Sequence, residues 1–361
     1  MHDPHVIAGE RTVFATERAT VTIAGIINAA HFRGALEPGW KRVLALSELA
    51  EEVDDADEGE LQALSEQFRV DRDLITAEET ERWLDERGLT LDDFGEFFRR
   101  HRPNGAPAAP AEEMELDYTS ASDDLRERLR IELLLSGEFD QIATQHAWRM
   151  AAIEGVESSS AAEAIEAERI RFYERSRVIP ATLNDWLGPL GCDRKWFDEM
   201  VNLEAVFRRQ SDELLSLESR QQMLQSLRVP LTRFELEEVE LESRDAAREA
   251  LLCASEDGLP LAEIAEEGRY PYRRLEIVCE DLPEELQQKF LCAATDEILD
   301  PIERGDGFQL CRLLRKNEPT LADDEVGARV EKHLLERHFS ELVARHVRWI
   351  MQLNSADDAP A

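Results

Sequence analysis

The stretch from Leu231 to Lys316 decides the fold of this chain: LTRFELEEVELESRDAAREALLCASEDGLPLAEIAEEGRYPYRRLEIVCEDLPEELQQKFLCAATDEILDPIERGDGFQLCRLLRK. Residues 234–241 (FELEEVEL) alternate apolar and acidic side chains, which is typical of a half-exposed strand. The pattern then predicts helical turns at 244–253 and 261–267, a short helix at 283–293, and strands at 298–302 and 307–314. The sequence RGDG at 304–307 predicts a tight turn, because glycine and aspartate tolerate positive φ.

Two segments on the N-terminal side of this stretch are related to each other. Residues 68–94 read FRVDRDLITAEETERWLDERGLTLDDF, and residues 172–197 read FYERSRVIPATLNDWLGPLGCDRKWF. Trp83 and Trp186 each precede a leucine, and a glycine follows each tryptophan by five residues and a phenylalanine by eleven. Each segment predicts a helix, a turn, a short helix ending in Trp-Leu, a glycine stop and a further helix. We interpret the tryptophans as core anchors of a duplicated helical domain rather than as walls of a cleft.

Longer helices are expected around these segments. Amphipathic helices at 40–53 and 125–152 precede the two copies. Apolar residues at helical spacing predict a long C-terminal helix at about 323–353, whose stripe requires a partner surface. The sequence PNGAPAAPAEE at 103–113 predicts a linker, because its prolines fix φ and remove backbone donors.

These elements predict an α+β fold that is mostly α. It consists of a duplicated N-terminal helical domain, a small antiparallel β/α domain, and a long C-terminal helix that packs back on the helical part. The expected boundaries are 1–102 for helical unit 1, 103–113 for the linker, 114–229 for helical unit 2, 230–316 for the β/α domain and 317–361 for the C-terminal helix and tail.

The composition is strongly acidic. The chain carries 78 acidic and 42 basic residues, which gives a formal net charge of −36. This charge argues against nucleic acid and anionic membranes as partners and favours basic ones, although it also serves solubility. The sequence has neither an apolar run long enough to span a membrane nor a secretory signal pattern. Five scattered cysteines without metal-ligand spacing indicate reduced thiols, a cytoplasmic location, and no metal or other cofactor.

The segment 233–316 resembles the parvulin family of peptidyl-prolyl isomerases. The matching features are ESRDAAREALL after the first strand, DGLPLAEIAEE, and LPEELQQKF followed by EILDPIERGDGFQLCRLL. Pro301, Gly307 and Phe308 hold the places of the proline, glycine and aromatic residue that close the family pattern. Helices before and after such a domain are similar to SurA-like and trigger-factor-like chaperones. The arrangement also resembles a PpiC-related group associated with peptide-maturation systems.

Three departures separate this chain from the parvulin pattern. The family places a histidine late in the first strand, where this chain has Glu238, and another in the final strand, where it has Gln309. The Gly-Gly loop of the family is replaced by EGRYPYRRLEIVCED at 267–281. Lowering the barrier to X–Pro rotation, about 18–20 kcal/mol, requires a desolvated pocket around the twisted amide, and a glutamate adds charge there. The resemblance therefore implies an isomerase-type domain whose catalytic histidines are absent, and we expect weak or no isomerase activity.

Most peptide-binding candidates come from the segment 267–281, which stands in place of the family loop, and from the expected short helix. Tyrosine and arginine are preferred anchors of peptide contacts, and apolar residues of the helix would line the former proline pocket. The alternative is that the loop is an ordinary surface turn and that the apolar residues are domain core. The candidates are Tyr270, Tyr272, Arg273, Arg274, Leu282, Leu286, Phe290 and Phe308.

The sequence therefore leads to three functional hypotheses. The first is a chaperone-like protein that binds an extended or unfolded, basic or proline-containing peptide, and the resemblance adds a peptide precursor handed to modifying enzymes. The second is an active prolyl isomerase with a rearranged site. The third is an acidic structural adaptor for protein partners.

Overall fold

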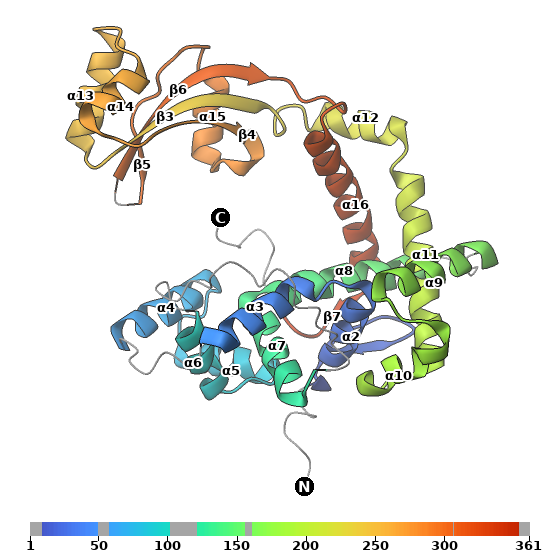
Figure 1. The fold of residues 1–361 in the computed structure, drawn as a ribbon. Coiled ribbons are helices and arrows are strands. Elements are labelled where there is room, and N and C mark those ends of the chain that lie inside the picture. Colours follow the sequence, from blue (N-terminus) through green and yellow to red (C-terminus); the bar gives the residue numbers. More distant parts are fainter. Residues whose placement is uncertain (1–8, 50–57, 102–120, 156–160, 306, 354–361) are drawn as a thin grey trace. The chain divides into compact units, whose positions relative to one another are not determined.

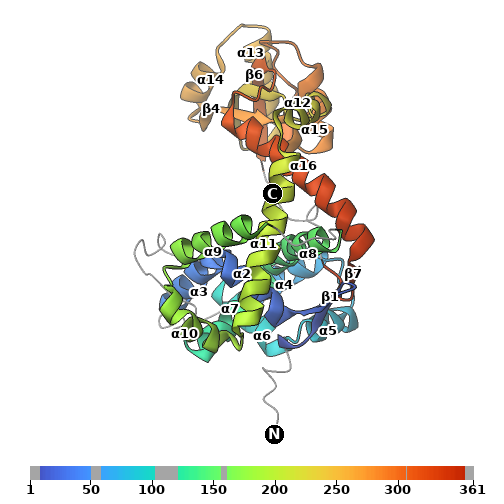
Figure 2. The same ribbon diagram turned by 90° about the vertical axis from the view of Figure 1, so that its right-hand side faces the viewer.

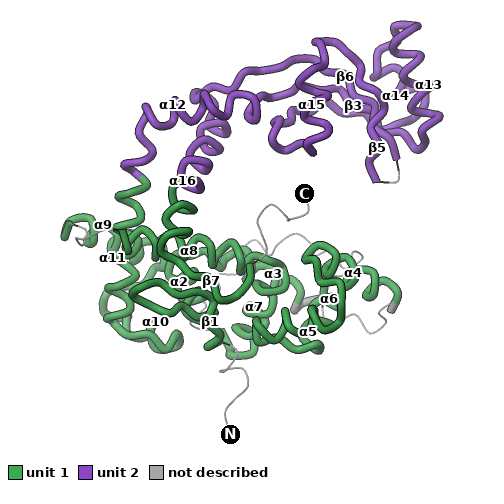
Figure 3. Tube along the Cα trace, turned by 180° about the vertical axis from the view of Figure 1, so that it is seen from behind, with its two compact units in different colours: residues 1–211, 338–361 green, residues 212–337 purple. Residues whose placement is uncertain are grey.

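The computed structural model describes residues 9–49, 58–101, 121–155, 161–305 and 307–353 (Figure 1). The chain divides into two compact units, which Figure 3 distinguishes by colour. Unit 1 comprises residues 1–211 and 338–361, and unit 2 comprises residues 212–337. The linker expected at 103–113 lies outside the described residues. The fold class is confirmed, because the described chain is mostly helical and contains small antiparallel sheets.

Unit 1 is built mainly from helices. They are α2 Ile23–Arg33, α3 Glu37–Leu49, α4 Glu58–Asp71, α5 Ala77–Glu86, α6 Leu91–Arg100, α7 Asp123–Ser136, α8 Glu138–Glu154, α9 Ala162–Ser176, α10 Leu183–Leu187 and most of α11 Arg194–Leu214. Short 3₁₀ turns at Pro180–Thr182 and Gly188–Leu190 flank α10. Capping boxes begin α5 at Thr76 and α6 at Thr90, so these two helix starts follow directly from local sequence.

A small sheet in unit 1 was not expected from the sequence. The strands β1 (Thr12–Ala15), β2 (Thr20–Thr22) and β7 (Arg348–Trp349) form an antiparallel sheet in the order β2-β1-β7, and Figure 2 shows β1 and β7 together. The C-terminal helix α16 (Asp324–His346) therefore ends before the predicted position of 353. The chain leaves the helix because β1 offers unpaired backbone: Val13 accepts hydrogen bonds from the amides of Ile350 and Met351. No local propensity encodes such a distant pairing.

The two related segments adopt the same order of elements. In the first, α4 leads to α5, a glycine turn and α6; in the second, α9 leads to α10, a glycine turn and α11. Gly88 and Gly191 have φ values of 62° and 64°, a left-handed conformation that glycine adopts without strain. Trp83 and Trp186 are both buried.

Each copy surrounds one phenylalanine with the tryptophan and a second phenylalanine. The ring centroids lie 5.5 Å apart for Phe68–Trp83, 5.2 Å for Phe68–Phe94, 5.0 Å for Phe172–Trp186 and 4.9 Å for Phe172–Phe197. All four pairs are edge-to-face, the geometry that aromatic quadrupoles favour. The repeated sequence pattern therefore corresponds to a repeated aromatic core.

The single helix expected at 125–152 is wrong. It is two helices, α7 and α8, which are interrupted at Gly137. Gly137 has a φ of 85°, outside the helical region, and it caps α7 in the left-handed conformation. The apolar spacing is similar on both sides of this glycine, so periodicity alone does not reveal the break.

A buried histidine in unit 1 makes stability dependent on pH. His146 on α8 is 4% exposed, and its Nδ1 lies 3.4 Å from Nη1 of Arg33, with Arg149 also nearby. Burial, followed by the charges of Arg33 and Arg149, lowers the pKa of His146 well below its ordinary value. The folded protein therefore keeps His146 neutral, whereas the unfolded chain binds a proton below a pH of about 6.5.

We expect the free energy of unfolding to fall as pH drops below about 6.5, by up to about 1.4 kcal/mol per pH unit from this group. The measurement is urea unfolding at pH 7.5, 6.5 and 5.5 for the wild type and for His146→Gln, which cannot titrate. The stability of the variant relative to the wild type should rise as the pH falls. His338→Gln is the control for loss of another histidine in the same unit. A constant difference between His146→Gln and the wild type across this range would refute the assignment.

Unit 2 contains a four-stranded antiparallel sheet in the order β4-β3-β6-β5. The strands are β3 (Arg233–Leu241), β4 (Tyr272–Val278), β5 (Ile302–Arg304) and β6 (Gly307–Asn317). The helices are α12 Leu217–Ser226, α13 Arg244–Ser255, α14 Leu261–Gly268 and α15 Glu284–Cys292. The long strands β3 and β6 form the centre of the sheet, and this places the short β5 and the seven-residue β4 at its two edges.

Two expectations for the strands need correction. Residues 267–281 stand in place of the Gly-Gly loop of the parvulin pattern, and no strand was predicted there. They contain the edge strand β4, and the alternation RLEIV is its sequence signal. The strand expected at 298–302 begins only at Ile302, while Ile298 makes an isolated bridge to Arg312. Pro301 explains the late start, because proline has no N–H to donate to a sheet ladder.

The two faces of the sheet are covered by different helices. Phe234 and Leu236 of β3 share an apolar core with Phe290 of α15. Val239 and Leu241, on the opposite face, share another core with α13 and α14. The alternation of β3 is therefore an alternation between two cores.

The helix α16 contributes to both units. Its N-terminal part places Val326 and Val330 in an apolar cluster with Met223 of α12 and Leu231 in unit 2. Its C-terminal part places Phe339, fully buried, beside other aromatic rings of unit 1. The ring centroid of Phe339 lies 4.6 Å from that of Phe207 and 6.0 Å from that of Trp148. The stripe predicted on the C-terminal helix is therefore divided between two partner surfaces.

Candidate functional site

Glu238 is the residue that the sequence resemblance places at the first histidine of the parvulin pattern. It lies in β3 between Arg273 of β4 and Cys311 of β6 in the sheet register. Its side chain is 3% exposed, and Oε1 accepts hydrogen bonds from Nε and Nη2 of Arg273 at 2.9 and 2.7 Å. The same Nη2 lies 3.1 Å from a carboxylate oxygen of Glu240. A buried carboxylate fixed by a half-exposed guanidinium therefore stands at this point of the sheet.

Cys311 and Gln309 lie on the neighbouring strand β6 and on the same face as Glu238. Cys311 is directly opposite Glu238, whereas Gln309 is opposite Glu240. Burial, reinforced by the charge of Glu238, raises the pKa of the Cys311 thiol to about 12. The thiol therefore stays protonated near neutral pH and is a poor nucleophile. Gln309 is buried, and its Oε1 accepts from Arg304 at 3.4 Å.

A second buried carboxylate lies on the opposite face of the sheet. Glu237 is 5% exposed, and its Oε1 accepts hydrogen bonds from the Tyr272 hydroxyl at 2.8 Å and from Nη2 of Arg274 at 2.6 Å. Arg312 of β6 lies 3.5 Å from its other oxygen. Tyr272 and Arg274 therefore belong to one face, and Arg273 to the other.

The remaining candidates are divided between the two cores. Phe290 is 2% exposed and packs on Phe234 at 5.5 Å between ring centroids, so it is a core residue of the α15 face. Leu282 and Leu286 are half-buried at the border of this core. On the α13 and α14 face, Tyr270 and Phe308 are half-buried against the other core.

The structure therefore brings only part of the predicted set together. Arg273 shares a face with Glu238 and Gln309, and Leu282 and Leu286 lie at the border of the core on that face. Sequence reasoning missed Glu237 and Cys311 as site residues. A sequence signal for Glu237 existed: two adjacent glutamates, Glu237 and Glu238, and two adjacent arginines, Arg273 and Arg274. Adjacent residues in a strand point to opposite faces, so each face receives one glutamate and one arginine. Matching the two pairs requires the strand register.

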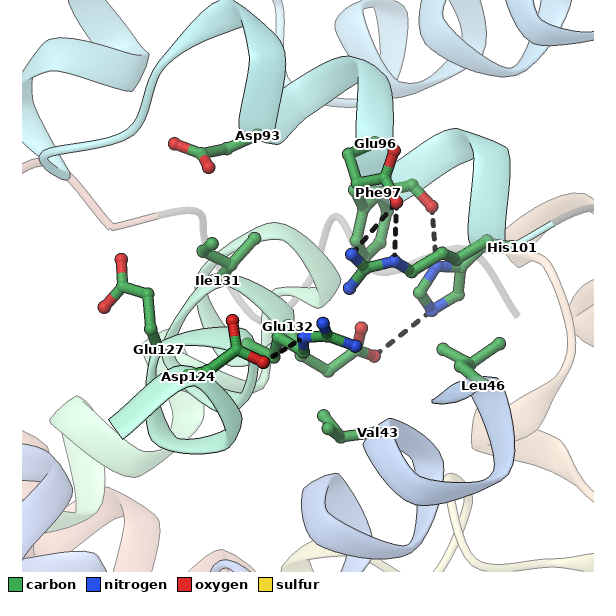
Figure 4. Close-up of a pocket in the computed structure, with 12 residues that line it drawn as sticks. Val43, Leu46, Asp93, Glu96, Phe97, His101, Asp124, Glu127, Ile131 and Glu132 are labelled. Carbon is green, nitrogen blue, oxygen red and sulfur yellow. Dashed lines mark hydrogen bonds and ion pairs between the residues drawn. The ribbon is translucent and has the colours of Figure 1, made fainter. Parts of the chain in front are cut away.

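Unit 1 contains a separate pocket of about 230 Å³ between α3, α6 and α7 (Figure 4). Val43, Leu46, Phe97 and Ile131 supply its apolar lining. The other lining residues are charged or titratable: Asp93, Glu96, Arg100, His101, Asp124, Glu127, Arg128 and Glu132.

Six of the eight charged or titratable residues of this pocket are paired with one another. Arg128 lies 2.9 Å from Asp124, Arg100 lies 2.9 Å from Glu96, and Nε2 of His101 lies 3.2 Å from Glu132 (Figure 4). Burial opposes protonation of His101, but the hydrogen bond and charge of Glu132 outweigh it, so the pKa of His101 is raised. Only the His101–Glu132 pair joins two elements, the end of α6 and α7, because the other two pairs lie within α7 and α6. Arg42 of α3 lies 3.0 Å from the same Glu132, so this carboxylate connects the three helices.

Among the described residues, no cluster of histidine, cysteine or acidic side chains has the geometry of a metal site. The five cysteines are free thiols. No described helix is both long and apolar enough to cross a membrane.

Comparison with known proteins gives matches only among solved structures. No protein-family model and no curated protein matches the chain. The peptidylprolyl isomerase PrsA from Bacillus cereus is 10% identical over 60% of this chain and 84% of its own, with a TM-score of 0.37. PrsA from Bacillus anthracis is 11% identical over 56% of this chain and 94% of its own, with a TM-score of 0.33.

A further match is a solved structure from Campylobacter jejuni. Its description calls the virulence factor PEB4 and the periplasmic protein Cj1289 structurally related SurA-like chaperones. It is 7% identical over 60% of this chain and 88% of its own, with a TM-score of 0.22. The expectation of a cytoplasmic location is contradicted by these neighbours, one of which is described as periplasmic, and it is not retained.

Proposed function

We propose that this protein binds extended or unfolded polypeptide in a chaperone-like role, and that its parvulin-like domain does not accelerate prolyl isomerisation. The observation that carries the proposal is the buried Glu238 carboxylate, hydrogen-bonded to Arg273 where the family pattern has an imidazole. A twisted X–Pro amide has no full charge to complement, so a charged pair at this point offers little transition-state stabilisation.

The protonated thiol of Cys311 and the amide of Gln309 do not replace the missing imidazoles. Neither the thiol, whose pKa is raised to about 12, nor a carboxamide exchanges protons near neutral pH. Together these features support binding without turnover.

The border of the α15 core supports peptide binding. Leu275 and Ile277 of β4 and Leu282 and Leu286 beyond it are half-buried and contact one core. Partly exposed apolar side chains beside an edge strand are a common setting for extended peptides. The net charge of −36 favours a basic peptide over an acidic one. The resemblance to the peptide-maturation group extends this proposal to a precursor handed to modifying enzymes.

The experiment has two measurements on the full chain. A protease-coupled assay with a prolyl tetrapeptide should show no acceleration of cis–trans isomerisation. Fluorescence anisotropy with a labelled, unstructured, basic proline-containing peptide should show saturable binding, and an acidic peptide of equal length should bind more weakly.

Matched variants separate this site from general stickiness. Leu286→Asp should weaken binding of the basic peptide about fivefold or more, since it places a carboxylate at the apolar border. Leu252→Asp alters a 53% exposed leucine on α13 and should leave binding unchanged. Strong isomerase activity would favour the rearranged-site alternative. Salt-sensitive capture of folded basic proteins, without any binding of the unfolded peptide, would favour the adaptor.

A further inference from the structure

The outer edge of β4 is a long unpaired strand edge. In the order β4-β3-β6-β5, β4 pairs with β3 on one side, and no described residue forms a ladder with the other side. It spans seven residues, whereas β5 at the opposite edge spans three. An exposed strand edge offers a row of N–H and C=O groups to any strand that can align with it.

The register with β3 identifies the backbone groups that point outward. The amide of Glu240 donates to Pro271 O at one end of the ladder, and the amide of Cys279 donates to Thr232 O at the other. Because hydrogen-bonded pairs alternate in an antiparallel ladder, the odd-numbered residues 273, 275 and 277 bond inward to β3. The even-numbered residues 272, 274, 276 and 278 therefore direct their backbone groups outward.

Two of the outward residues carry opposite charges. The side chains of Arg274 and Glu276 are 69% and 56% exposed, and Leu275 stands between them. Arg274 contacts Glu237 and Tyr272, and Glu276 lies 3.7 Å from Arg233. A guanidinium has five donors and a carboxylate four lone-pair sites, so each group can take a further partner.

We propose that the β4 edges of two copies of this chain pair antiparallel in a register centred on Leu275. In that register Arg274 of each copy lies opposite Glu276 of the other, Tyr272 lies opposite Val278, and the two Leu275 side chains meet at the axis. The outward backbone groups of residues 274 and 276 then face each other as hydrogen-bonded pairs. Two ion pairs and an apolar contact accompany the ladder.

The neighbouring registers are excluded by charge. Outward groups must face outward groups, so the next allowed registers are centred on residue 274 or on residue 276. The first places Arg274 opposite Arg274 of the second copy, and the other places Glu276 opposite Glu276. Like charges directly opposite each other destabilise a strand pair. The sequence Arg-Leu-Glu thus specifies one symmetric register.

The interface is small and its affinity should be modest. Pairing of two seven-residue strands falls below the roughly 1,200 Å² of a standard stable interface, so a reversible dimer in the micromolar range or weaker is expected. The net charge of −36 on each copy opposes association, but screening at about 0.15 M salt limits that repulsion to short distances. The inference concerns self-association, and it shares Leu275 of β4 with the border proposed to bind client peptides.

The test is sedimentation equilibrium of the full chain over a concentration series at about 0.15 M salt. The wild type should show a monomer–dimer equilibrium. Arg274→Glu and Glu276→Lys each place two like-charged pairs opposite each other in the dimer, and each should weaken it about tenfold or more. Arg248→Glu and Glu249→Lys make the same charge changes on exposed positions of α13 and should leave the equilibrium unchanged.

A mixture of the two edge variants provides the decisive measurement. In the mixed dimer, the two carboxylates of the Arg274→Glu chain face the two cationic side chains of the Glu276→Lys chain, so opposite charges are restored at both positions. Tagged copies should therefore form the heterodimer in preference to either homodimer. Failure of the mixture to restore association, with both variants shown to be folded by circular dichroism, overturns the proposal.

Glu276→Pro separates self-pairing from pairing with a client. It removes an outward N–H without removing a bond to β3 and should abolish the dimer. A wild-type chain that remains monomeric at every concentration contradicts the proposal. If that monomer loses binding of the unfolded peptide on Glu276→Pro, the edge pairs with a client strand instead.

Discussion

Phe172→Ala is expected to lower the free energy of unfolding of unit 1 by about 3–5 kcal/mol. Phe172 is fully buried, and its ring contacts those of Phe32, Trp186 and Phe197 at centroid distances of 4.8, 5.0 and 4.9 Å. Alanine removes the buried ring and leaves a cavity that the surrounding aromatic groups cannot fill without losing their own geometry.

The measurement is urea unfolding followed by tryptophan fluorescence. All six tryptophans lie in the residues of unit 1, so the signal reports on this unit alone. Ile170→Ala, on the same helix α9 but 49% exposed, should cost less than about 1 kcal/mol. Equal effects of the two substitutions would show that the aromatic cluster is not the core of the second repeat.

Arg273→Met is expected to destabilise unit 2 by about 2 kcal/mol, although Arg273 itself is half-exposed. The substitution leaves the Glu238 carboxylate, which is 3% exposed, without the donors that it uses at 2.7 and 2.9 Å. Removing one partner of a buried ion pair is costly because the remaining charge stays buried without a partner. The main cost of Arg273→Met is therefore the unpaired carboxylate of Glu238.

Glu238→Leu is expected to be much less costly than Arg273→Met. Removing the Glu238 carboxylate leaves Arg273, whose side chain is 51% exposed and can be solvated. The new leucine extends the apolar core beside Leu236 and Cys311. The double variant should be close to Glu238→Leu. Hydrogen exchange of peptides from β3 and β6 measures all three, because unit 2 contains no tryptophan. A double variant as unstable as Arg273→Met alone would contradict the asymmetry.

Much of the local structure could be predicted from the sequence. The capping boxes at Thr76 and Thr90, the left-handed glycines after Trp83 and Trp186, and the alternation of β3 are decided by residues close together in the chain. One error was local, because apolar periodicity did not reveal the left-handed Gly137 that separates α7 from α8. Another arose where a distant partner decided the outcome. The C-terminal helix ends early because β1 accepts the amides of Ile350 and Met351.

The candidate site was harder to predict than the fold. The departures at Glu238 and Gln309 are visible in the sequence, but the partner of Glu238 is not. Arg273 and Arg274 are adjacent in the chain, yet one bonds Glu238 and the other Glu237 on the opposite face. Only the register between β3 and β4 assigns them.

The amino-acid sequence by itself determined the helix order of the two related segments, the strand β3, the duplicated aromatic pattern and the lack of histidine at Glu238 and Gln309, because these depend on residue identity and short-range spacing. The tertiary structure decided which carboxylate meets which guanidinium, which apolar stripe belongs to which core, and which strand edge stays unpaired. These outcomes depend on strand register and on contacts between residues far apart in the chain, and short-range propensities do not specify them.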